Sequence, residues 1–105
     1  MMDIAFTFTG RLWEWPAKAS WFFITLPSER ADEVRFFTSD EMMGPRRGFG
    51  SVRVAVCIGK TSWQTSLFPD KQSGSYVLPV KAAVRAAETI KAGDDVRVTL
   101  RLLMR

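Results

Sequence analysis

The sequence contains no histidine, one cysteine (Cys57) and no apolar run of the length that a membrane-spanning helix needs, about 20 residues. Without histidine, the Ser-His-acid and Cys-His catalytic arrangements cannot form, and neither can the common zinc sites that use histidine. A lone cysteine cannot form an internal disulfide, and the first residues lack the apolar stretch of a secretory signal. We therefore expect a soluble cytoplasmic protein that makes no membrane contact.

The composition is that of an ordinary globular domain. The chain has 105 residues, of which 47% are hydrophobic and 25% charged. A chain of this length buries roughly two thirds of its unfolded surface, so we expect one domain over residues 1–105 that needs no metal, disulfide or cofactor. The net charge of +4 favours anionic partners, although an ordinary solvated basic surface explains the same excess.

Alternation of apolar and polar residues predicts six strands, because a strand with one buried face repeats every two residues. The first two predicted strands are close enough in sequence to form a hairpin. Gly10 interrupts the first of them, which indicates either a β-bulge or the close approach of another backbone. The predicted strands cover residues 3–15, 18–26, 51–58, 61–68, 76–78 and 96–102.

Two short helices are predicted, each opened by a proline, because proline suits the first helical position. The first runs from Pro27 to Phe37, and the second runs from Pro79 to an end at Gly93. Residues 38–50 are rich in glycine and read as a loop. The order of elements is then ββα-βββα-β. The predicted core-facing helical residues are Ala31, Val34 and Phe37 in the first helix and Val80, Ala83, Val84, Ala87 and Ile90 in the second.

The two halves of the chain share a weak repeat. Leu26-Pro27 and Leu78-Pro79 each precede a predicted helix, and a glycine followed by a basic residue occurs at Gly10-Arg11 and at Gly59-Lys60. A duplication would explain the repeat and would predict a closed barrel with approximate two-fold symmetry. Chance explains it as well, since glycine and proline punctuate most small β domains.

Several stretches together resemble a bacterial domain family of unknown function, DUF1905. They are residues 47–54 (RGFGSVRV), 63–69 (WQTSLFP) and 76–85 (YVLPVKAAVR), with Ala92-Gly93-Asp94 beyond them. The resemblance implies a mainly β fold, the six-stranded double-split β-barrel with two short helices. That fold is related to swapped-hairpin transcription regulators and antitoxins. The family brings no established activity, and a shared fold alone does not transfer one.

The loop 44–50 is the first candidate for binding. Its glycines let backbone amides approach a ligand, and Arg46 and Arg47 offer forked donors suited to phosphate or carboxylate. The alternative is a solvated loop whose arginines only keep it soluble. Lys81 and Arg85, one turn apart on the polar face of the second helix, either hold an acidic ligand or extend over the barrel end.

The aromatic residues leave two interpretations open. Four tryptophans beside basic residues can stack nucleic-acid bases, but tryptophan more often fills a core. Trp63 shares a strand face with Thr65 and Leu67 that lines either the barrel interior or a groove. A histidine-independent enzyme would need Tyr76, Ser66 and Lys81 to converge in a polar pocket.

The function predicted from these observations is a non-enzymatic binding module for an anionic small molecule or a protein partner. One alternative is nucleic-acid binding by analogy with swapped-hairpin regulators, which requires a dimer and a convergent basic face. The other is the histidine-independent enzyme. The candidate ligand-binding residues are Arg46, Arg47, Phe49, Trp63, Tyr76, Lys81 and Arg85.

Overall fold

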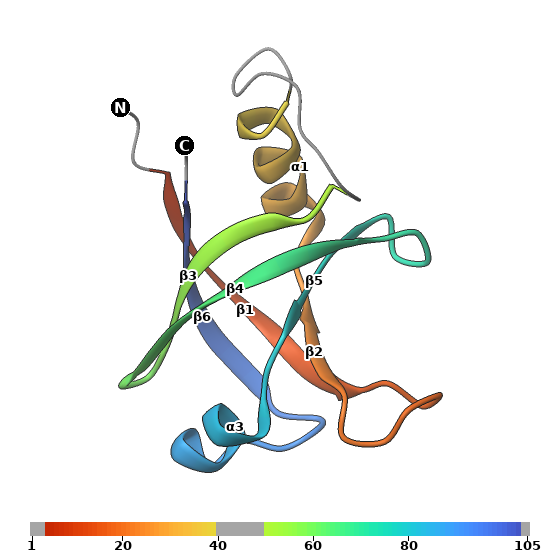
Figure 1. Cartoon of the computed structure of the whole chain (residues 1–105), viewed down its shortest axis with the longest axis vertical. Coiled ribbons are helices and arrows are strands. Elements are labelled where there is room, and N and C mark those ends of the chain that lie inside the picture. The colour runs from red at the N-terminus through yellow and green to blue at the C-terminus, as the bar shows by residue number, and fades with distance from the viewer. Residues whose placement is uncertain (1–3, 40–49, 104–105) are drawn as a thin grey trace.

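The computed structural model describes residues 4–39 and 50–103, which form a closed barrel of six antiparallel strands (Figure 1). The order around the barrel is β1-β2-β5-β4-β3-β6, and β6 closes onto β1. This confirms the predicted mainly β fold and its ββα-βββα-β order. The strands are β1 (Ala5–Glu14), β2 (Phe22–Thr25), β3 (Val52–Ile58), β4 (Thr61–Asp70), β5 (Ser75–Pro79) and β6 (Asp95–Leu102), and the helices are α1 (Ser28–Phe37) and α3 (Ala82–Glu88).

Inward-facing residues alternate with outward-facing ones along the strands, as the sequence predicts. On β6, every second residue from Val96 to Leu102 is buried, and the residues between them are exposed. Burying a Val or Leu side chain contributes roughly 1.5–3 kcal/mol, so the barrel interior dominates the stability of the fold. The side chains with no exposed surface include Leu12, Ile24, Val54, Leu67, Leu78, Val98 and Leu100.

Gly10 lies where β1 changes its partner. β1 pairs with β6 as far as Arg11 and with β2 from Leu12 onward. A Cβ atom on Gly10 would lie 2.5 Å from Cγ2 of Ile24 and 3.3 Å from the carbonyl oxygen of Thr25. The register continues through Gly10, so of the two sequence interpretations the close approach of a neighbouring strand is correct and the bulge is wrong.

The helix α1 covers one end of the barrel, and α3 lies at the other (Figure 1). Ala31 and Val34 of α1 are fully buried, and Phe37 packs against the core, as predicted. The helix begins directly after Pro27, which is its N-cap residue. Within residues 4–39 and 50–103, no helix is long and apolar enough to span a membrane.

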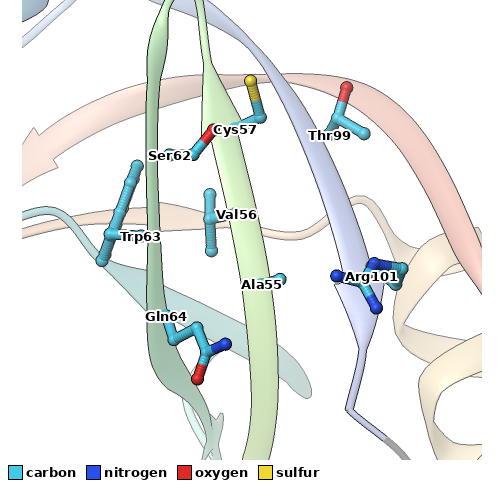
Figure 2. Close-up of a pocket in the computed structure, with 8 residues that line it drawn as sticks. All are labelled: Ala55, Val56, Cys57, Ser62, Trp63, Gln64, Thr99 and Arg101. Carbon is cyan, nitrogen blue, oxygen red and sulfur yellow. The ribbon is translucent and has the colours of Figure 1, made fainter.

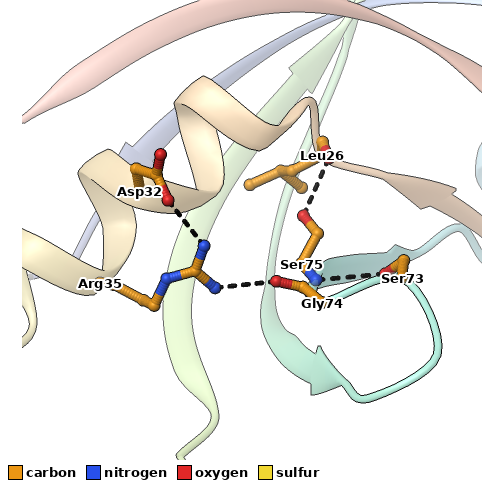
Figure 3. Close-up of polar contacts among 6 residues, drawn as sticks. All are labelled: Leu26, Asp32, Arg35, Ser73, Gly74 and Ser75. Atoms are coloured by element: carbon orange, nitrogen blue, oxygen red, sulfur yellow. Dashed lines mark hydrogen bonds and ion pairs between the residues drawn. The ribbon is translucent and has the colours of Figure 1, made fainter.

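Polar contacts attach α1 to the turn between β4 and β5 (Figure 3). The Arg35 guanidinium donates to the carbonyl oxygen of Gly74 at 3.0 Å and to the Asp32 carboxylate at 2.7 Å. The buried Ser75 hydroxyl donates to the carbonyl oxygen of Leu26 at 2.8 Å. These bonds fix the segment that enters α1 against the start of β5.

The second strand is shorter than predicted. Residues 18–26 were expected to be extended, but β2 covers only Phe22–Thr25. The turn that precedes it continues to Ser20 instead, because the Lys18 amide donates to the carbonyl oxygen of Trp15 at 3.2 Å and Ser20 has a positive φ of 76°. The predicted hairpin between β1 and β2 is confirmed.

The start of the second helix was also predicted too early. Pro79 does not open a helix but ends β5, opposite Phe23 of β2. The Val80 amide then donates to the carbonyl oxygen of Phe22 at 2.9 Å, which extends the strand pairing and delays the helix to Ala82. Lys81 is therefore the N-cap residue of α3 and not part of its polar face.

The end of this helix differs from the prediction as well. Thr89, with a φ of 54°, takes the left-handed cap position that was expected of Gly93. Gly93 uses its positive φ in the following turn, where its amide donates to the carbonyl oxygen of Leu12 at 2.8 Å. Because α3 is short and begins late, Ala83 and Ala87 are exposed and only Val84 is buried within it.

One carboxylate attaches α3 to the barrel. Oε2 of Glu88 accepts hydrogen bonds from the Lys60 amide at 3.2 Å and from the Thr61 hydroxyl at 2.6 Å. We expect Glu88→Ala to lower the free energy of unfolding by about 1–2 kcal/mol, because bonds to a charged acceptor are lost. Urea denaturation measures this, with Lys71→Ala in an exposed turn as the control. Equal stability of the two variants would contradict this role for Glu88.

The strand pairing has the two-fold symmetry that a duplication predicts. Exchanging β1, β2 and β3 with β4, β5 and β6 leaves the order of pairing unchanged. Leu26-Pro27 directly follows β2, and Leu78-Pro79 forms the end of the equivalent strand β5, so this part of the repeat occupies similar but not identical places. Gly10 lies inside a strand while Gly59 lies in a turn, so the glycine-basic steps are not equivalent.

Candidate functional site

An open groove of about 430 Å³ lies on the outer face of β3, β4 and β6. Its side chains come from three neighbouring strands (Figure 2). Most of them occupy the outward positions that alternate with the buried valines and leucines of the core. The groove is lined by Ala55, Val56, Cys57, Ser62, Trp63, Gln64, Thr99 and Arg101.

The strand register arranges the outward side chains of this face in rows. In one row, Cys57 lies opposite Ser62 on β4 and Thr99 on β6. The Thr99 hydroxyl is 3.1 Å from that of Thr7, its partner on β1. In the next row, Ala55 lies between Gln64 and Arg101. Directly opposed residues on one sheet face are close neighbours, so small and hydroxyl-bearing side chains form the shallow bottom of the groove beside the long side chain of Arg101.

The charge on this face is positive. Arg53, Arg97 and Arg101 are exposed, and none of them takes part in an ion pair among the described residues. Arg53 donates to the Ser66 hydroxyl at 3.3 Å. The carboxylate of Asp95, at one edge of the face, lies 3.6 Å from the Arg11 guanidinium. On this surface, three guanidinium groups therefore have no carboxylate partner within the part of the chain that the structure describes.

This arrangement suits the binding of an anion. A guanidinium presents several N–H donors in a planar fork that matches phosphate and carboxylate oxygens. The hydroxyl groups of Ser62 and Thr99 and the amide of Gln64 add neutral donors beside Arg101. Cys57 donates its thiol to the carbonyl oxygen of Gly59 at 3.5 Å.

The comparison with protein families agrees with the architecture. The model of the family described as "Domain of unknown function (DUF1905)" matches residues 8–100. The chain belongs to the DUF1905 family. No match was found among the curated proteins. The family description names no activity, so the function of this DUF1905 domain has to be argued from its own surface.

The predicted ligand-binding residues lie in different parts of the DUF1905 domain. Arg46, Arg47 and Phe49 fall outside the described residues. Trp63 lines the groove and packs its half-buried ring against the core. Tyr76 is buried in the core, with the Arg35 guanidinium carbon 5.9 Å from its ring centroid.

The two basic residues predicted on the second helix lie in different surroundings. Lys81 is exposed at the N-cap of α3. Arg85 is half-buried, with its guanidinium carbon 3.7 Å from the Phe22 ring centroid. Its Nε donates to the carbonyl oxygen of Val80 at 3.2 Å. Arg85 therefore covers the barrel end, as the alternative interpretation of this residue expected.

The polar pocket required by the enzyme hypothesis does not form from the residues named for it. Tyr76 belongs to the core, and Ser66 lies on the outer face, bonded to Arg53. Lys81 lies beyond the end of β5. These side chains occupy three different surroundings and do not converge.

A second surface feature is a group of aromatic side chains on the β1–β2 hairpin, here called the aromatic cluster: Trp13, Trp15, Trp21 and Phe23. Trp13 and Phe23 are directly opposed across the strands, with ring centroids 5.3 Å apart. The rings of Trp15 and Trp21 are 5.4 Å apart. Trp15 is 40% exposed and Trp21 is 44% exposed, so these two tryptophans lie on the surface and not in the barrel core.

The outer face of β3, β4 and β6 with its three exposed arginines, here called the arginine face, was not predicted from the sequence, although the pattern that indicates it is present. The alternation that identifies the buried residues of β3 and β6 also identifies the outward ones. Those outward positions hold Arg53, Arg97 and Arg101, with Thr99 between the last two. Only the strand pairing shows that β3 and β6 are neighbours, since they are far apart in the chain.

Proposed function

We propose that this DUF1905 domain is a non-enzymatic binding module for an anionic ligand and that the outer face of β3, β4 and β6 is its binding surface. The observation that supports it best is a set of three exposed arginines that have no carboxylate partner within residues 4–39 and 50–103 and that lie beside rows of hydroxyl groups. Unpaired guanidinium groups on a rigid sheet are already placed for a ligand, so little ordering is needed on binding.

The side chains that line the groove support binding without catalysis. They supply guanidinium, hydroxyl and amide donors, which hold an anion. They include neither a carboxylate nor a lysine amine to act as a general base. The proposal therefore requires no chemical step.

The arginines are spread along the sheet and do not surround one point. Arg97 and Arg101 are outward residues of the same strand, four positions apart, which corresponds to about 13 Å at about 3.3 Å per residue. The Leu103 amide donates to the carbonyl oxygen of Arg53 at 3.0 Å, so Arg53 lies beyond Arg101 on the neighbouring strand. An anion with several charges would contact more of these groups than a single carboxylate.

We expect the Arg53→Gln, Arg101→Gln double variant to bind inorganic tripolyphosphate at least about ten-fold more weakly than the unchanged protein. Charge-assisted hydrogen bonds contribute about 1.5–3 kcal/mol each, and about 1.4 kcal/mol corresponds to ten-fold in affinity. Isothermal titration calorimetry at low salt measures the affinity. Lys71→Gln removes one exposed charge from the β4–β5 turn and serves as the matched control.

The same titration compares this surface with the loop predicted from sequence. The Arg46→Gln, Arg47→Gln double variant removes the two loop arginines, and Lys81→Gln removes the basic N-cap residue of α3. If the loop variant loses binding while the Arg53→Gln, Arg101→Gln variant binds as the unchanged protein does, the site lies on the loop and the proposal is contradicted. Binding of tripolyphosphate that no variant weakens would contradict both locations.

A further inference from the structure

The arginine face and the aromatic cluster belong to one continuous outer surface of the barrel. Arg97 on β6 lies directly opposite Thr9 on β1. From Thr9, the outward positions of β1 continue through Arg11 to Trp13, and the chain then reaches Trp15 at the end of the hairpin. A ligand lying along β6 and then β1 would pass from arginine side chains to exposed indole rings.

The length of this surface suits a chain-like ligand. From Arg101 to Arg97 is four residues, and from Thr9 to Trp15 is six, which together make about 33 Å at about 3.3 Å per residue. The path from Arg101 along β6 and then β1 to Trp15 is here called the track. The largest dimension of the molecule is 39 Å, so the track spans most of one side. Small β-barrels that hold single-stranded nucleic acid cover about 4–16 nucleotides.

The aromatic cluster presents ring surface beside a positive charge. Trp15 and Trp21 are exposed over 40% and 44% of their surfaces at the end of the hairpin. Nζ of Lys18 lies 4.5 Å from the Trp21 ring centroid. A base stacked on these indoles would therefore have a cation close to its phosphate. Two carboxylates lie along the track within the described residues: Asp95 faces Arg11 at 3.6 Å, and Glu14 accepts a hydrogen bond from the Ser20 amide at 3.2 Å.

We infer that the ligand of this domain is a single-stranded nucleic acid, whose backbone lies on Arg53, Arg97 and Arg101 and whose bases stack on Trp15 and Trp21. This inference rests on the proposed anion-binding function and names the class of ligand. Every base has an aromatic face, and only an unpaired base can place that face on an indole ring. A small anion would use the arginines and leave the tryptophans uncontacted, whereas a duplex keeps its bases stacked on one another.

Fluorescence anisotropy with a labelled 15-nucleotide oligo-dT at several salt concentrations tests the inference. The Trp15→Ala, Trp21→Ala double variant should bind the oligonucleotide roughly a hundred-fold more weakly, about ten-fold for each base that loses its stacking partner. The same variant should bind tripolyphosphate as the unchanged protein does, because the arginines remain. Phe36→Ala removes an aromatic ring that is 59% exposed on α1 and is the matched control.

The three arginines of the arginine face should determine how strongly oligo-dT binding depends on salt concentration. Each phosphate contact to a single strand contributes about 0.7 to the slope of log K against log salt, so the Arg53→Gln, Arg97→Gln, Arg101→Gln variant should lower that slope by about 2. Tryptophan fluorescence of the unchanged protein should be quenched by oligo-dT and not by tripolyphosphate. This second readout requires no variant and remains informative if the Trp15, Trp21 variant does not fold.

The outcomes separate the inference from the function on which it rests. Tripolyphosphate binding that depends on the arginines, together with oligo-dT binding unaffected by the tryptophan variant, would overturn the single-strand inference and leave the anion-binding module intact. Tighter binding of a duplex than of oligo-dT would overturn it as well. Binding of neither tripolyphosphate nor oligo-dT at low salt would overturn both.

Discussion

Replacing Leu100 with alanine is expected to lower the free energy of unfolding by about 2–5 kcal/mol, the range for a large buried residue whose loss leaves a cavity. Leu100 has no exposed surface and lies in register with Phe6 on β1 and Val56 on β3. It packs where the first, third and last strands meet, so the cavity would open at the closure of the barrel. Urea denaturation followed by circular dichroism measures the change.

Arg97→Gln is the matched control for Leu100→Ala, because Arg97 is an exposed residue of the same strand. Exposed substitutions usually change stability by less than about 0.5 kcal/mol. A loss below about 1 kcal/mol for Leu100→Ala would show that the barrel interior is not packed as described. The control also shows whether the Arg97→Gln substitution of the triple arginine variant leaves the protein folded.

Replacing Gly10 with alanine is expected to destabilise the protein by about 1–3 kcal/mol, the usual cost of overpacking. In a position free of contacts, the same change commonly stabilises by about 0.4–1 kcal/mol, because it restricts the unfolded chain. The sign is reversed here since the new Cβ would lie 2.5 Å from Cγ2 of Ile24. β1 or β2 would have to move at the point where β1 changes partner.

A double-mutant cycle tests this cause. In an Ile24→Ala background the nearest atom is absent, so Gly10→Ala should cost less than it does alone, with a coupling of at least about 0.5 kcal/mol. Thr9→Ala, at an exposed neighbouring position, is the control for the loss of strand propensity. Additive effects of the two substitutions would contradict a steric origin.

Much of the fold is predictable because alternation and burial have one common cause. The pattern Val52, Val54, Val56 and Ile58 predicts β3 correctly, since each of these side chains faces the barrel interior. The first helix is predictable for a similar reason, because Ala31 and Val34 match its spacing and Pro27 precedes it. Where the local pattern and the tertiary packing agree, the sequence is sufficient to predict the element.

The errors occur where pairing across the barrel prevails over local preference. Pro79 is a good first residue for a helix, but its strand continues because the Val80 amide has a partner in the carbonyl oxygen of Phe22. No local pattern contains that bond, since the two residues are far apart in the chain. Thr89 likewise takes the helix cap in place of Gly93, which the following turn requires.

The candidate site was less predictable than the fold. An outward residue contributes to a site only with its neighbours on adjacent strands, and Arg53 and Arg101 become neighbours through the pairing of β3 with β6. Their charges look like ordinary solvated residues until that pairing is known. The tryptophans were ambiguous for the same reason, because only the hairpin register places Trp15 and Trp21 on the outer surface.

The most direct test of the anion-binding face is a titration of the ¹⁵N-labelled protein with tripolyphosphate, followed by amide chemical shifts. We expect the largest changes at Thr99, Arg101 and Gln64, with little change in α1. In the Arg53→Gln, Arg101→Gln variant those changes should be lost at the same ligand concentration. Changes confined to residues 44–50, or absent from β3, β4 and β6, would contradict the assignment of this face as the binding surface.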